Sequence, residues 1–191
     1  MAPIPYVLSA MFVLGCAGLV FRELVRRQYQ RHGRLRWWAT LAQLLVFSMW
    51  AYFGYRQLPA TWPASDVHWI LRQIGWTFFV GGVSGTLLAG INLGAGTSFG
   101  VDRPTLEMSG FYRLVRNPQA TAFGVALLGH MLVWPTWRLG GALFLYFPIV
   151  HLMVLAEEEH LARMLGDEYR EYQLSVSRYL PGRRGSPGSA T

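Results

Sequence analysis

The sequence predicts an all-α integral membrane protein of about five transmembrane helices, including a helical hairpin, with a C-terminal amphipathic helix on the cytoplasmic side. Apolar residues make up 52% of the 191 residues and charged residues only 14%, well below the roughly 25% of soluble domains. Apolar stretches close to the ~20 residues that a bilayer crossing needs recur along the chain. We therefore expect one membrane domain, 1–191, without a separate soluble catalytic domain.

The first three apolar segments form an N-terminal transmembrane region, 1–95. They lie at residues 4–21, 37–55 and 69–93, and each has nearly the length of a membrane-spanning helix. The third segment is rich in glycine, and Gly81 and Gly85 form a small-xxx-small face that suits close helix packing.

The fourth and fifth apolar segments, 120–134 and 139–155, are shorter. A tight turn, Trp134-Pro-Thr-Trp-Arg138, joins them, and the pair is typical of a helical hairpin. Their shortness leaves a second interpretation open, a re-entrant pair that does not fully cross the bilayer.

The segment after the last span has its own helical pattern. Leu161, Leu165, Tyr169, Tyr172 and Val176 recur at helical spacing, with charged residues between them, and Gly166 interrupts the run at a predicted bend. This segment is either an amphipathic helix on the interface or a flap over the cytoplasmic mouth of the bundle. Residues 182–191 are rich in Gly, Ser and Pro, and we expect a disordered tail.

Arginine predicts the orientation. All 17 basic residues are Arg, and 14 of them fall on one side of a five-span arrangement. The positive-inside rule then places the N-terminus outside and the C-terminus in the cytoplasm, and we expect a bacterial inner membrane. Membrane topology and anionic lipid headgroups account for the net charge of +7, so no nucleic-acid partner is expected.

Two polar clusters lie at the mouths of apolar segments, Arg116-Asn117-Pro118 and Glu157-Glu158-Glu159. On the predicted topology both face the cytoplasm. Polar groups near lipid are costly and usually functional. Taken singly, the first cluster is also typical of a helix entry, and the second of a charged helix leaving the membrane. His130 and His151 stand alone in apolar segments, so we expect buried polar or substrate-pocket residues and no metal site.

These clusters carry a resemblance to a known family. Ser109-Gly-Phe-Tyr-Arg-Leu-Val-Arg-Asn-Pro118 resembles the SG-x-Y-x(3)-RHP or RNP signature of the membrane methyltransferases. That superfamily includes isoprenylcysteine carboxyl methyltransferase and the phospholipid N-methyltransferases. The run from Glu157-Glu158 through Gly166 and Tyr172 to Pro181 resembles the second half of the same signature. The resemblance marks 104–181 as a methyltransferase-like, cofactor-binding region.

The resemblance implies S-adenosylmethionine bound in a cytoplasmic pocket under the C-terminal helix, with a lipophilic acceptor entering from the membrane. It implies catalytic roles for Arg116, Glu157 and Glu158. The cofactor's carboxylate suits Arg116 or nearby N–H groups, its ammonium suits Glu157, and Tyr112 offers an aromatic wall. The positions that the resemblance assigns to cofactor binding are Thr105, Leu106, Tyr112, Arg116, Asn117, Pro118, Gln119 and Glu157.

Three positions depart from the wider family pattern. The usual tyrosine two residues after the proline is Ala120, and the usual histidine is Asn117, as in the phospholipid-methylating branch. The arginine that the prenylcysteine enzymes use for their substrate is Met153. We therefore expect a lipid amine or thiol as acceptor rather than a prenylcysteine carboxylate. The alternatives are an NADPH-dependent membrane reductase of the sterol-reductase type and a non-catalytic membrane accessory protein.

Overall fold

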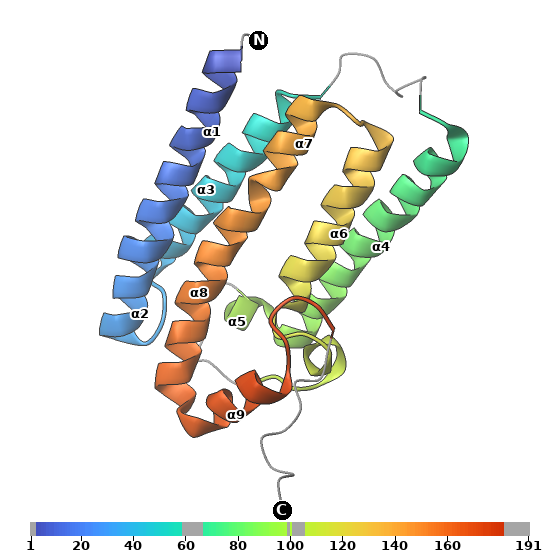
Figure 1. Ribbon diagram of the computed structural model, residues 1–191. Helices are drawn as coiled ribbons and strands as arrows, with labels where there is room; N and C mark the ends of the chain where they lie inside the picture. The colour runs from blue at the N-terminus through green and yellow to red at the C-terminus, as the bar shows by residue number, and fades with distance from the viewer. Residues whose placement is uncertain (1–2, 59–66, 99, 101–105, 182–191) are drawn as a thin grey trace, which may run out of the picture.

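The computed structural model describes residues 3–58, 67–98, 100 and 106–181, and its regular structure in these residues is helical. The predicted disordered tail, 182–191, lies outside the described residues. Figure 1 shows long helices side by side, with the short helices α2, α5 and α9 at the end of the bundle opposite the N-terminus. The elements in chain order are α1 (Pro3–Gly18), the π-helical η1 (Leu19–Val25), α2 (Arg26–His32), α3 (Trp37–Tyr55), α4 (Trp69–Leu93), α5 (Ala95–Ser98), the 3₁₀-helical η2 (Gly110–Arg113), α6 (Pro118–Val133), α7 (Trp137–Phe144), α8 (Tyr146–Leu165) and α9 (Asp167–Ser175).

Three helical stretches are long and apolar enough to cross a membrane: Ile4–His32, Trp69–Leu93 and Trp137–Leu165. The protein is therefore an integral membrane protein. The predicted second and third segments coincide with α3 and α4. A crossing by α6, which has 16 residues, and the total of five spans stay predictions.

The first helical stretch is longer than predicted, because it continues from residue 21 through charged residues to His32. Ala17, Phe21, Val25 and Tyr29 recur at every fourth position, and each is 5% exposed or less. This buried stripe holds the helix against the bundle while the arginines on its other face stay exposed. Gly33, at φ 65°, then ends the helix in the left-handed conformation.

Glycine brings α4 and α6 into close contact, but at positions other than those predicted. A Cβ atom at Gly75 would lie 2.8 Å from Val133 Cγ2, and Cβ atoms at Gly82 and Gly129 would overlap the backbone of the facing helix. The predicted pair, Gly81 and Gly85, lies to the side of this contact: Gly81 faces open space, and a Cβ atom at Gly85 would meet only the Ala122 side chain. The interface therefore depends on the neighbouring face of α4.

The predicted hairpin is formed by α6, α7 and α8. The Thr136 hydroxyl accepts a hydrogen bond from the Leu139 amide and caps α7. The helix breaks at Leu145, because Pro148 lacks the N–H group that would bond to the carbonyl of Phe144. The α7–α8 stretch is long enough to cross a membrane.

Gly166 separates α8 from α9, as predicted, at φ 59°. The last turns of α2, α4 and α8 lie at one end of the bundle, together with α5, α9 and the start of α6 (Figure 1). Both polar clusters of the sequence lie at this end, at the start of α6 and near the end of α8. Which side of the membrane this end faces stays a prediction.

Candidate functional site

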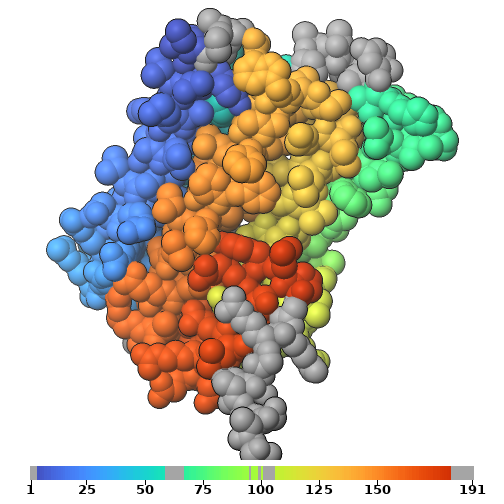
Figure 2. All heavy atoms as spheres, viewed as in Figure 1, coloured from blue at the N-terminus to red at the C-terminus, as the bar shows by residue number. Residues whose placement is uncertain are grey.

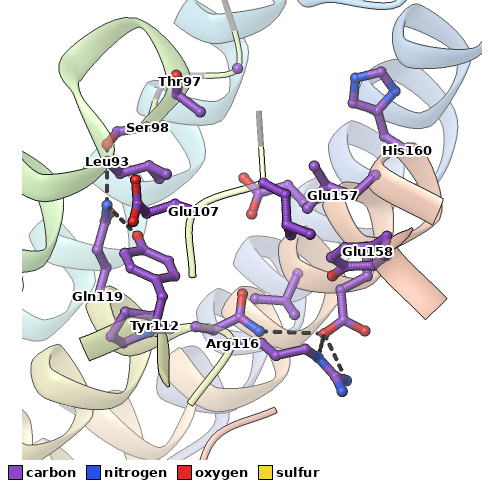
Figure 3. A pocket seen from close by; sticks show the side chains of 18 of the residues that line it. Leu93, Thr97, Ser98, Glu107, Tyr112, Arg116, Gln119, Glu157, Glu158 and His160 are labelled. Atoms are coloured by element: carbon purple, nitrogen blue, oxygen red, sulfur yellow. Dashed lines mark hydrogen bonds and ion pairs between the residues drawn. The ribbon is translucent and has the colours of Figure 1, made fainter. Parts of the chain in front are cut away.

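A pocket opens at this end of the bundle, between the last turn of α4, η2, the start of α6, α8 and α9. Every predicted site residue that the structure describes lines it; Thr105 lies outside the described residues. Figure 3 shows side chains from these elements pointing toward a common space. The predicted residues in the wall are Leu106, Tyr112, Arg116, Asn117, Pro118, Gln119, Glu157 and Glu158.

The three consecutive glutamates of α8 have three different environments. Successive helical residues point about 100° apart, so each carboxylate meets a different neighbour. Glu158 is buried and paired with two arginines. Glu159 is on the outside of the bundle and pairs with Arg26 on α2 at 2.7 Å and with Arg163 at 2.8 Å. Glu157 points into the pocket (Figure 3), and its carboxylate makes no hydrogen bond or ion pair with another described residue.

The buried ion pair joins the two polar clusters of the sequence. Arg116 Nη2 lies 3.1 Å from Glu158 Oε1, and both side chains are 5% exposed. Arg178 Nη2 approaches the other carboxylate oxygen at 2.7 Å. Arg116 Nη1 also donates to the carbonyls of Gln173 and Val176, both at 2.8 Å. The Arg116 guanidinium therefore fastens the end of α9 to α8.

The residues after α9, 176–181, form a segment that lies along the start of α6; we call it the C-terminal strap. Val115 and Ser177 form an isolated parallel bridge. The amides of Arg116 and Asn117 donate to the carbonyls of Ser177 and Arg178 at 2.9 and 3.2 Å. Backbone bonds and the ion pair thus hold α9 and the C-terminal strap against the pocket, as the flap interpretation predicts.

Tyrosines and amides form the other polar wall. Gln119 Nε2 donates to Tyr112 Oη at 3.4 Å and to Ser98 Oγ at 3.1 Å (Figure 3). The Tyr172 hydroxyl donates to the Tyr112 carbonyl at 2.6 Å. Burial raises the pKa of Tyr112, and it raises the pKa of Tyr172 to about 12. Both phenols therefore stay neutral at physiological pH; the Tyr172 hydroxyl donates to a carbonyl, and the Tyr112 hydroxyl accepts from Gln119.

Several pocket residues were not among those predicted, including Tyr29, Glu107, His160, Tyr169 and Tyr172. His160 is buried and stacks on Tyr29, with ring centroids 4.1 Å apart and planes at 8°. The sequence could have indicated His160 as a pocket residue, because it lies one helical turn after Glu157. Tyr169 and Tyr172 belong to the helical stripe that the sequence shows. No sequence signal pointed to Tyr29, because α2 meets α8 only in the folded chain.

A family model described as phospholipid methyltransferase matches residues 69–168. The match begins with α4 and ends just after Gly166, so it contains both polar clusters and most of the pocket wall. No curated protein and no solved structure matches the chain.

Proposed function

Because the chain belongs to the phospholipid methyltransferase family, we propose that it transfers a methyl group from S-adenosylmethionine to a lipophilic acceptor, an amine or thiol carried on a lipid or small apolar molecule. The family match makes the chain a membrane methyltransferase. The cofactor and the acceptor class belong to the proposal. The observation that carries it is the Glu157 carboxylate, which faces the pocket with no hydrogen bond or ion pair to another described residue.

Glu157 fits one end of the cofactor. The amino-acid part of S-adenosylmethionine carries an ammonium group, and an ammonium–carboxylate contact is a charge-assisted hydrogen bond of the stronger kind. The neighbouring Glu158 already has two arginine partners, and Glu159 has partners outside the pocket. Of the three carboxylates, only Glu157 has its bonding capacity open toward the pocket.

The tyrosines fit the rest of the cofactor. Tyr29, Tyr112, Tyr169 and Tyr172 all line the pocket. Aromatic faces attract a cation such as the sulfonium, and they also suit the flat adenine ring. When bound, the cofactor supplies a methyl group activated by its positive sulfur. The work of the protein is then to position the two reactants and to keep water out.

Arg116 and Glu158 act as positioning residues in this proposal. The nitrogens of Arg116 bond to Glu158, Gln173 and Val176, so its guanidinium holds α9 in place over the pocket. The tight cover formed by α9 and the C-terminal strap would limit water around the reacting groups.

The walls of the pocket favour an acceptor without a carboxylate. Met153 lies in the wall where the prenylcysteine enzymes are expected to carry an arginine. Among the described residues that line the pocket, the arginine is Arg116, and its guanidinium is already bonded to Glu158 and to the carbonyls of Gln173 and Val176. An amine or thiol needs no such cation and therefore fits better.

Two measurements on purified protein test the proposal. Thermal stability with S-adenosylmethionine, with NADPH and without ligand separates a methyltransferase from a reductase and from an accessory protein, because a ligand stabilises the form that binds it. Labelled methyl donor is then supplied with phosphatidylethanolamine, alkyl thiols and a farnesylcysteine analogue. We expect stabilisation by S-adenosylmethionine and label in the amine or thiol. Label in the farnesylcysteine carboxylate at the best rate would contradict the acceptor class.

A further inference from the structure

We infer that a second, apolar cavity next to the polar pocket holds the hydrocarbon part of the methyl acceptor, with the acceptor's reactive end at Ala120. This inference rests on the proposed function and adds a binding site to it. The cavity has a volume of about 470 Å³ and lies between α6, α8 and the C-terminal strap. Figure 2 shows the surface hollowed between α6 and α8, directly beside the strap.

Ala120 lies at the boundary of the two cavities, because it lines both of them. It lies in the first turn of α6, two residues after Pro118. The short side chain leaves space where a tyrosine, as the wider methyltransferase pattern has it, would fill the boundary. In this proposal, a molecule seated in the apolar cavity presents its end to the polar pocket at Ala120.

The polar groups of the apolar cavity gather near Ala120. The Tyr146 hydroxyl donates to the Ala120 carbonyl at 3.1 Å, and the Thr121 hydroxyl donates to the Tyr179 carbonyl at 3.0 Å. His151 Nδ1 lies 2.9 Å from the Tyr179 hydroxyl. These contacts place the polar side chains of the cavity wall around one end.

The rest of the wall is apolar. Further along α6 it is formed by Gly124, Val125 and Leu128, and across from them by Phe147 and Val150 on α8. Val125 and Leu128 are 37% and 50% exposed, on the outer face of α6. A cavity with one polar end and an apolar body matches an amphiphile with a small head and a hydrocarbon chain.

Substitutions that fill the cavity test this assignment. Gly124→Leu adds a side chain inside it; a Cβ atom there meets Phe147 Cε1 at an ordinary 3.6 Å. Leu128→Trp fills the same space from an exposed position. Gly81→Leu is the matched control, because Gly81 lies on an open face of α4 with no atom within 4 Å of a Cβ.

The first readout is chain length. In a series of n-alkyl thiols and n-alkylamines, kcat/KM of the unchanged protein should rise with chain length while the chain still fits, by at most about fourfold per methylene, the value for transfer of one CH₂ from water. Both filled variants should lose about tenfold on the longest chains and little on the shortest, whereas Gly81→Leu should match the unchanged protein. All four proteins are assayed in the same detergent, so partition of the alkyl chains into micelles cancels when the proteins are compared with one another. Equal chain-length profiles in all four proteins would overturn the inference.

The second readout does not depend on turnover. Dodecylamine with a photoreactive diazirine near the end of its chain should label peptides that contain residues 124–128 and 147–150, and Gly124→Leu should lower this labelling several-fold. Labelling that Gly124→Leu leaves unchanged would overturn the inference even if methyl transfer is found. Reduced labelling in a protein that transfers methyl to no acceptor would instead contradict the proposed function and leave the cavity assignment standing.

Discussion

Glu157 and Glu158 are adjacent on α8, but only Glu158 is neutralised by the protein: two arginines bond to its carboxylate, while Glu157 faces the pocket with no hydrogen bond or ion pair to another described residue. This difference in bonding suggests different roles for the two carboxylates. Glu158 and its arginines join α8 to the cover of the pocket, and we propose that the Glu157 carboxylate receives the cofactor. A carboxylate that is partly removed from water is costly unless it is paired or protonated, so a bound cation such as the cofactor's ammonium would stabilise Glu157.

Removal of Arg116 should destabilise the fold. Arg116→Met leaves the Glu158 carboxylate buried with only Arg178, which is 33% exposed, as a cation. Breaking a buried pair typically costs about 3–5 kcal/mol, and the free energy of unfolding in mixed micelles measures it. The double change of Arg116 and Glu158 to Met should recover part of this loss, because no unpaired buried carboxylate remains. A single variant as stable as the unchanged protein would show that the pair does not hold the cover in place.

The contact between Tyr172 and Tyr112 should matter for the pocket at neutral pH. Tyr172→Phe removes a donor to the Tyr112 carbonyl and should cost about 1 kcal/mol of stability. Burial raises the pKa of Tyr172 to about 12, so the folded state favours the neutral phenol. This contribution is complete below the ordinary tyrosine pKa of about 10 and is lost as pH rises toward 12.

The stability difference between the unchanged protein and Tyr172→Phe should accordingly be constant from pH 6 to 9. Unfolding measured across this range checks it. A difference that shrinks between pH 6 and 8 would mean that another titrating group controls the contact.

The close packing of α4 against α6 should be lost when a glycine at their contact is replaced by a residue with a side chain. Gly82→Leu places a side chain where the backbone of Ala126 lies, and overpacking of this kind costs typically about 1–3 kcal/mol. Gly81→Leu, one residue away on the open face, should keep the stability of the unchanged protein. Thermal unfolding of the two variants compares them directly. Equal losses would contradict the helix interface described above.

The predicted topology rests on the distribution of arginines and can be tested without purified protein. Reporter fusions after Arg36 and Gly110 should both indicate the cytoplasm, because 14 of 17 arginines lie on that side of the predicted arrangement. A fusion after Arg184 should do the same, and one near Ala64 should report the outside; both positions lie outside the described residues. An outside signal at Gly110 would place the pocket on the wrong side for a cytoplasmic cofactor.

Much of the helical layout was predictable from the sequence. Apolar runs gave the bounds of α3 and α4, and Gly166 gave the break before α9, because both depend on local hydropathy or backbone freedom. The first helix was predicted too short, since the run of charges at Arg22 hid the buried stripe that continues to Tyr29. In an apolar helix every face looks alike, so the sequence could not show that α4 meets α6 through Gly82 and not through Gly81.

The sequence predicted which residues line the site but not which residues they bond to. The signature brought Tyr112, Asn117 and Glu157 together in one expected pocket, and the structure places all three in the lining of one pocket. The partners around the buried ion pair were not visible, because the carbonyls of Gln173 and Val176 reach Arg116, and Arg178 reaches Glu158, only after α9 folds back. The apolar cavity was also hidden, since it forms between helices that are separated in the chain.

Binding of S-adenosylmethionine to variants of the glutamate run tests the central claim most directly. Equilibrium binding should be weaker for Glu157→Gln by about 1.5–3 kcal/mol, the range for a hydrogen bond to a charged group. Glu159→Gln should bind almost as the unchanged protein does, because Glu159 pairs with Arg26 and Arg163 outside the pocket. Equal affinity in the unchanged protein and in Glu157→Gln, or an equal loss in both variants, would contradict the account.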